Sequence, residues 1–251
     1  MESMDAANTI RGSVAKVSEL RRSAATHGAL LQANKAVKRF QARRFAGTYA
    51  DLLASPAYSG AARFFLDELY SDKDYALRDA QFARIASALQ TFFPEQVVAT
   101  AVALAQLHAL TEELDQEMAA AWLAQAGESG RSDALRYIHA WKTVGRREDR
   151  ERQLSDVLRV GEELDRLTRK PGLRMMLRMM RKPAEVAGLG ALQSFLESGF
   201  DTFAEMARKG SRAREFLDTI RLRETAWFAH LYGPDLVTSE TKLMACLGKA
   251  P

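Results

Sequence analysis

The sequence contains a single cysteine, Cys246, among 251 residues. One cysteine excludes an intramolecular disulfide, and it cannot supply the group of thiolates that a cysteine-based zinc site needs. A chain without disulfides suits a reducing compartment. We therefore expect a cytoplasmic protein.

Proline and glycine are also scarce, with six and fifteen residues respectively. Between them, apolar residues recur at spacings of three and four, which is the period of an α-helix. No segment shows the alternation of a half-buried strand. The sequence therefore predicts an all-α protein, a multi-helix bundle of about eight to ten helices joined by short turns.

Long apolar runs are missing as well. The longest uncharged apolar stretch, residues 96–111, falls short of the roughly 20 residues that cross a bilayer. The N-terminus carries charge throughout and lacks the apolar centre of a secretory signal. We expect neither a transmembrane segment nor export.

The helical period is sustained longest between Pro94 and about Gln125. This predicts one long central helix over residues 94–125, which the glycines of 127–130 end. We expect residues 1–251 to form a single helical domain, and the point where two subdomains would separate is near 127–131.

Local signals place other elements. The pattern predicts a helix over residues 30–53, and Ser55 followed by Pro56 is typical of a helix start. Leu196 and Phe200 belong to the strongest amphipathic stripe and are expected in the core. The tail after Pro234 is expected to be short and peripheral.

Polar residues interrupt the apolar seam of the long helix. At about 100° per residue, His108 and Asp115 share a stripe with Leu104 and Trp122, and Thr111 and Glu112 lie beside it. Such a His and acid can satisfy each other in the core, orient an imidazole as a base, or bind a ligand or metal. His108, Thr111, Glu112 and Asp115 are therefore candidate ligand-binding residues, with a structural pairing as the plainer alternative.

Arg223 lies on the apolar stripe of the last long helix, near His230. A buried guanidinium needs a carboxylate. The expected partner is one of four acids, and Arg223 and His230 join the candidate ligand-binding residues. The four acids are Asp67, Asp79, Glu112 and Asp115.

The four histidines form no Glu-x-x-His or His-x-x-x-His pattern, so a di-iron centre of the helical-bundle type is not expected. A haem needs one axial histidine, and His108 could supply it. Phosphate-binding and dinucleotide-binding glycine patterns do not occur. No metal site and no catalytic residue are predicted, and any cofactor is unknown.

Residues 169–182, here called the basic methionine segment, hold six bases, four methionines and no acid. Its arginines at 174, 178 and 181 are spaced to share a helical face, with Leu173, Met176, Leu177 and Met180 on the other. Such a segment suits an acidic protein partner, an anionic surface or a nucleic-acid backbone. A solvated face over a methionine-filled core is the alternative. The candidate partner-binding residues are Arg174, Met175, Arg178, Met179 and Arg181.

Three stretches carry a family resemblance: Phe64–Tyr70 (FFLDELY) followed by Arg78-Asp79, Leu107–Asp115 (LHALTEELD) and Gly188–Phe200 (GLGALQSFLESGF). With them the chain resembles a bacterial family of uncharacterised helical proteins from about residue 60 to 230. The resemblance implies a shared helical fold. It implies no activity.

These observations favour a non-catalytic binding or protein-interaction protein that could also self-associate. One alternative is a helical haem-binding or apolar-ligand-binding protein, or an oxidoreductase, centred on His108. A second is a protein that binds acidic partners or nucleic acid through the basic methionine segment.

Overall fold

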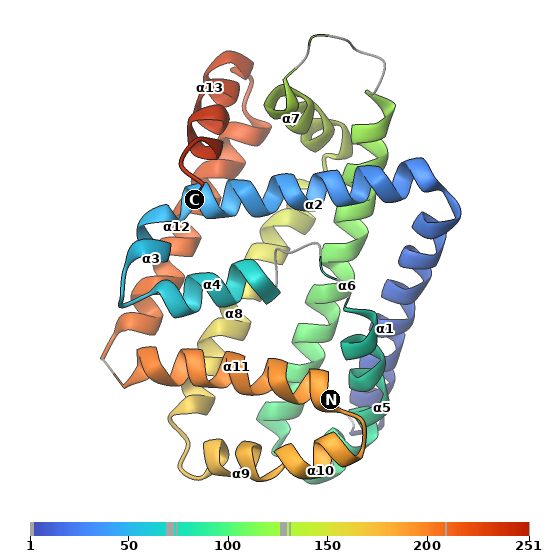
Figure 1. The fold of residues 1–251 in the computed structure, drawn as a ribbon, viewed down its shortest axis with the longest axis vertical. Helices are drawn as coiled ribbons and strands as arrows, with labels where there is room; N and C mark the ends of the chain where they lie inside the picture. Colours follow the sequence, from blue (N-terminus) through green and yellow to red (C-terminus); the bar gives the residue numbers. More distant parts are fainter. Residues whose placement is uncertain are drawn as a thin grey trace. The chain divides into compact units, whose positions relative to one another are not determined.

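The computed structural model describes residues 3–68, 73, 75–125, 130, 132–208 and 210–250 (Figure 1). These residues form helices and no strand, which confirms the all-α prediction. The helices are α1 Ser3–Thr26, α2 Gly28–Thr48, α3 Ala50–Ala54, α4 Ser59–Glu68, α5 Ala76–Phe92, α6 Glu95–Ala124, α7 Asp133–Val144, α8 Arg147–Thr168, α9 Leu173–Met179, α10 Arg181–Val186, α11 Gly190–Ala207, α12 Arg212–Tyr232 and α13 Leu236–Leu247.

The long helix expected over residues 94–125 is confirmed as α6. The described residues form thirteen helices rather than eight to ten, because several segments are broken into short helices. The predicted helix 30–53 is interrupted at Tyr49, whose φ of −115° and ψ of 23° are not helical. Ser55 accepts a hydrogen bond from the backbone N–H of Ala57 at 3.3 Å, yet α4 begins only at Ser59.

The chain divides into two compact units, which we describe separately. Unit 1 comprises residues 1–19, 73–110 and 155–217, and unit 2 comprises residues 20–72, 111–154 and 218–251. Of the predicted break near 127–131, only Gly130 is among the described residues. The single-domain prediction stays a prediction.

Unit 1 has two clusters of buried apolar residues. In the first, Ile10 of α1 and Ala86 of α5 are fully buried, and Val98 and Val102 of α6 are buried in the same cluster. In the second, Leu167, Phe200 and Ala204 are buried, with Leu173 and Leu177 of α9 packed against them. Phe200 is thus a core residue as predicted, whereas Leu196 is only half-buried.

Unit 2 has an aromatic core. Phe40 of α2 stacks on Tyr137 of α7 with ring centroids 4.5 Å apart, and Trp141 lies 6.2 Å from Phe228 of α12. Interactions of this kind between rings add to the free energy gained by burying them.

The expectation of a peripheral tail after Pro234 is wrong. Asp235 caps α13 by accepting a hydrogen bond from the Thr238 N–H at 3.0 Å, and Leu243 of this helix is fully buried in the unit 2 core. Gly47 of α2 lies so close to α13 that a Cβ there would come within 2.0 Å of the Cys246 carbonyl oxygen. The last helix is therefore part of the packed core.

Among the described residues, one helix, α6, is long and apolar enough to cross a membrane. The core helix of a globular protein meets the same criterion. The apolar window of α6 is 44% buried, and its residues Val98, Leu114 and Met118 are core residues.

Candidate functional site

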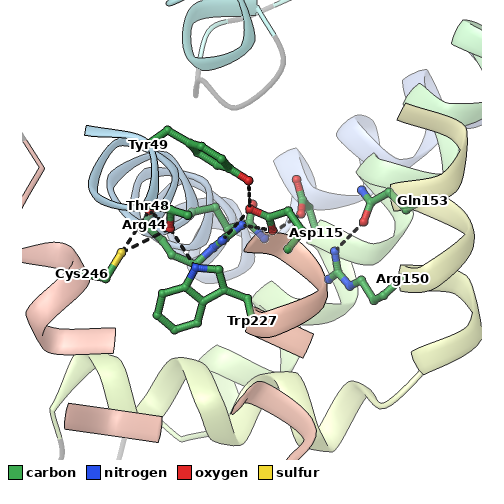
Figure 2. A network of polar contacts seen from close by, with 10 residues as sticks. Arg44, Thr48, Tyr49, Asp115, Arg150, Gln153, Trp227 and Cys246 are labelled. Carbon is green, nitrogen blue, oxygen red and sulfur yellow. Dashed lines mark hydrogen bonds and ion pairs between the residues drawn. The ribbon is translucent and has the colours of Figure 1, made fainter. Parts of the chain in front are cut away.

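Most of the buried polar residues of unit 2 gather in one network, which we take as the candidate site (Figure 2). Its charged groups come from α2, α6, α8 and α12. One polar stripe on α2 carries much of it, because Lys38, Gln41, Arg44 and Thr48 are spaced three and four apart and so share a face. The buried members are Gln41, Arg44, Glu112, Asp115, Arg150 and Glu224.

An ion pair between α2 and α12 lies at the centre of this network. The two Nη atoms of Arg44 donate to the two carboxylate oxygens of Glu224 at 3.0 and 2.9 Å. The Tyr49 hydroxyl donates to the same carboxylate at 2.8 Å. Since both charged side chains are over nine-tenths buried, this two-point geometry offsets a large desolvation cost.

Thr48 is the second centre of the network (Figure 2). Its hydroxyl accepts a hydrogen bond from the Trp227 indole N–H at 2.9 Å and lies 3.3 Å from the Cys246 sulfur. The same hydroxyl donates to the Arg44 carbonyl at 2.8 Å. A buried cysteine in such contacts acts as a small, weakly polar packing group.

Asp115 is held in the interior by a neutral group. It accepts a hydrogen bond from the Gln41 amide at 3.0 Å. Burial raises the pKa of the Asp115 carboxyl above its ordinary value of 3.8, and the positive charges of Lys38 and Arg150 oppose that rise. Folding therefore disfavours the ionised form of Asp115 relative to the protonated form.

Glu112 and Thr111 connect the long helix to its neighbours. Glu112 accepts hydrogen bonds from the Lys38 ammonium at 2.7 and 2.9 Å, and the Arg21 guanidinium lies 3.5 Å away. The Thr111 hydroxyl accepts from the Gln153 amide at 2.8 Å. Three of the four polar residues predicted on this helix thus belong to the network or adjoin it.

Arg150 closes the network on the α8 side. Its guanidinium lies over the Trp141 ring, 4.4 Å from the centroid, and donates to the Gln153 side-chain oxygen at 3.2 Å. The Leu114 carbonyl is a longer contact at 3.5 Å. The aromatic face and the amide together stabilise a guanidinium that is 4% exposed.

The expected pairing of His108 with Asp115 is wrong. His108 belongs to unit 1, where its Nε2 lies 3.0 Å from a carboxylate oxygen of Asp79 on α5. Residues seven apart on a helix are two turns apart, about 10 Å along the axis, which is too far for a direct hydrogen bond. His108 and Asp79 form a separate local pair.

Arg223 is half-buried rather than buried, and its partner is none of the four acids that were expected. It makes two hydrogen bonds of 2.7 Å to Asp51 in the first turn of α3 and a third of 2.8 Å to the Thr48 carbonyl. The hydrogen bonds from Arg223 hold the pKa of Asp51 below its ordinary value. Arg223 therefore adjoins the network through the backbone of Thr48.

His230 lies beside Lys242 of α13, with 3.1 Å between Nε2 and Nζ. Partial burial, and then the positive charge of Lys242, lowers the pKa of His230 below 6.5. Its neutral form is therefore favoured near neutral pH.

The basic methionine segment forms the turn after α8, then α9 and the start of α10, in unit 1 (Figure 1). Three of its four arginines are paired with two acids of α11. Arg174 donates to Asp201 at 2.7 Å and Arg178 at 3.4 Å, while Arg181 donates to Glu197 at 3.1 Å. These pairings were not anticipated.

The predicted apolar face of α9 is half-buried at Leu173, Met176 and Leu177 but exposed at Met180. Leu173 and Leu177 pack against the core, but Met175 and Met179 are 64% and 62% exposed and Met180 is 42% exposed. Three of the four methionines of the segment therefore face solvent, and Met176 is half-buried.

Sequence reasoning missed Arg44, Arg150 and Glu224, three of the buried charges of the network. A signal for the α2 stripe was present in the spacing of Lys38, Gln41 and Arg44. It is ambiguous, because the same spacing is usual for the solvated face of a helix. Among the described residues, no three side chains of the His, Cys, Asp and Glu types lie close enough to hold a metal ion.

Comparison with known proteins places the chain in a family. A family model described as a domain of unknown function, DUF8198, matches residues 20–236. The chain belongs to this family. The DUF8198 match includes the basic methionine segment and every buried charge of the network, and it ends before Cys246. No curated protein and no solved structure matches the chain.

Proposed function

We propose that this member of the DUF8198 family is a non-catalytic binding protein that docks an anionic partner through the basic methionine segment. The observation that carries the proposal is the exposure of Met175, Met179 and Met180 beside Arg178, Arg181 and Lys182. Large apolar side chains exposed together are typical of interaction sites.

The way in which the segment is held supports a surface role. Leu173 and Leu177 fasten α9 to the core, and the Gln193 amide donates to the Leu177 carbonyl at 2.7 Å. The exposed methionines contribute little to this packing. They leave an apolar edge that a partner can cover.

The charge of the segment supports an anionic partner. Asp165, Glu197 and Asp201 pair with its arginines, but the six bases outnumber these three carboxylates. A net positive charge remains, which attracts negatively charged surfaces over roughly a Debye length of 8–10 Å.

The buried network supports a binding protein rather than an enzyme. Arg44 is paired with Glu224 and Glu112 with Lys38 inside unit 2, while Asp115 and Arg150 are held by neutral side chains. Groups held in this way stabilise one packing arrangement. His108 is likewise engaged by Asp79.

The test is binding of the purified protein to three anionic probes: polyglutamate, RNA and phosphatidylserine vesicles. The variant Arg178→Gln/Lys182→Gln should weaken binding to whichever probe is bound, and added salt should do the same. Arg159→Gln/Arg166→Gln is the matched control, because these exposed arginines of α8 also pair with carboxylates. Equal losses in both variants would show that binding is a property of overall charge and not of this segment.

A further inference from the structure

The basic methionine segment exposes apolar and basic side chains that alternate along its length. Met175 and Met179 are four residues apart, so they lie one above the other on the same face of α9. Met180, which is 42% exposed, precedes α10, and Val186, which is 91% exposed, is the last residue of that helix. Arg178, Arg181 and Lys182 are exposed between them.

We propose that this segment binds the surface of an anionic lipid bilayer, with the methionines entering the headgroup region and the bases beside anionic headgroups. The proposal rests on the proposed function, since it names the partner of the same segment. A helix that lies in a membrane interface needs this arrangement of apolar and basic side chains, and it needs no groove.

The arginine pairs favour a lipid surface over an acidic protein. Arg174, Arg178 and Arg181 already hold Asp201 and Glu197. A protein partner that binds arginine through two-point carboxylate pairs would have to displace these acids. A bilayer acts instead through a diffuse negative potential and through burial of apolar side chains, so the pairs can remain.

Methionine also suits this role. Its side chain is unbranched and flexible, and it adapts to an irregular and fluid surface. Because Leu173 and Leu177 keep α9 on its own core, inserting Met175 and Met179 requires no unfolding of unit 1.

The first measurement is flotation of the full chain with phosphatidylcholine vesicles that contain or lack phosphatidylserine. Binding is expected only with phosphatidylserine and should fall as salt is added. Met175→Ser/Met179→Ser is expected to weaken binding about tenfold, and Lys182→Gln about fivefold. Met244→Ser, which changes a methionine of α13 that is 55% exposed, is the matched control and should bind like wild type.

The second measurement reports insertion directly. An environment-sensitive dye is attached to the thiol of Met175→Cys, or of Met244→Cys as the control. The native Cys246 is 6% exposed and should react slowly with the dye. Dye emission should shift to the blue on vesicles only at position 175. Thermal melting of each variant identifies any that fails to fold. If the methionine variants fail to fold, the binding of the Lys182→Gln chain still tests the proposal.

The outcomes separate the two proposals. Vesicle binding that survives Met175→Ser/Met179→Ser without a dye shift overturns lipid insertion. Binding of polyglutamate or RNA through this segment, with no binding to vesicles, also overturns it but leaves the proposed function standing. If none of the three probes binds, both proposals fail.

Discussion

Arg44 and Glu224 are 180 positions apart in the sequence, and their side chains meet in a buried two-point ion pair of 3.0 and 2.9 Å. Each carries a charge that the interior of unit 2 tolerates only because the other is there. Glu224 also accepts a hydrogen bond from the Tyr49 hydroxyl, so two side chains of a distant part of the chain depend on one carboxylate.

Glu224→Gln should therefore lower the free energy of unfolding by about 3–5 kcal/mol, because it leaves the Arg44 guanidinium buried without its counter-charge. Urea denaturation followed by circular dichroism measures this. The double variant Arg44→Met/Glu224→Leu should lose less than Glu224→Gln alone, since it removes both charges and keeps the volume apolar. A double variant that loses as much stability as Glu224→Gln, or more, would contradict this coupling.

Asp115→Asn should be as stable as wild type or more stable at pH 7. Asparagine can still accept the Gln41 hydrogen bond, and it removes a carboxylate whose pKa is raised by burial. Because the folded pKa lies above 3.8, the folded state binds the proton more tightly, and stability is lost as the pH rises through the raised pKa.

The advantage of Asp115→Asn should accordingly shrink as the pH falls from the raised pKa toward 3.8, and it should vanish below 3.8, where the carboxyl is protonated in both states. Thermal melting of both proteins across acid and neutral pH measures the difference. A variant that is less stable than wild type at pH 7 would show that Lys38 and Arg150 stabilise the ionised form more than burial destabilises it.

Gly47→Ala should destabilise the protein, by about 1–3 kcal/mol, because the new methyl group meets the Cys246 carbonyl and forces α13 away from α2. Gly12→Ala is the matched substitution: Gly12 is also inside a helix, but a Cβ there meets nothing within 4 Å. It should stabilise α1 by about 0.5–1 kcal/mol. Equal effects at the two positions would show that the α2–α13 contact is looser than described.

Phe200→Ala should lower the free energy of unfolding by about 3–5 kcal/mol, since this ring is buried with Leu167 and Ala204. Leu196→Ala should cost clearly less, because Leu196 is only half-buried on the same helix. Chemical denaturation of the two variants gives the comparison. A larger loss at Leu196 would place the centre of that core elsewhere.

Helix content and the long helix α6 could be predicted from the sequence because helical periodicity is a local property. The thirteen separate helices could not, since the break at Tyr49 and the short α9 and α10 reflect how neighbouring segments pack. Propensity and pattern are weak where a segment is short, and tertiary contacts then decide.

Among the candidate residues, the stripe of Thr111, Glu112 and Asp115 was identified correctly as polar groups facing into the protein, but their partners were not. The partners Gln153, Lys38 and Gln41 lie 42 to 74 positions away. A helical stripe indicates which direction a side chain faces. It does not indicate which other helix lies opposite.

The sequence by itself determined that this chain is helical, that it has one dominant helix over residues 95–124, and that it carries a basic methionine segment. Those properties follow from composition and from spacing along a few turns. Tertiary structure alone decided that Arg44 meets Glu224, that His108 meets Asp79, and that α9 packs its two leucines against the core and exposes Met175 and Met179. A buried polar group must find a partner, and any of several residues of opposite charge satisfies that need in the sequence; only the packing of helices brings one of them within 3 Å.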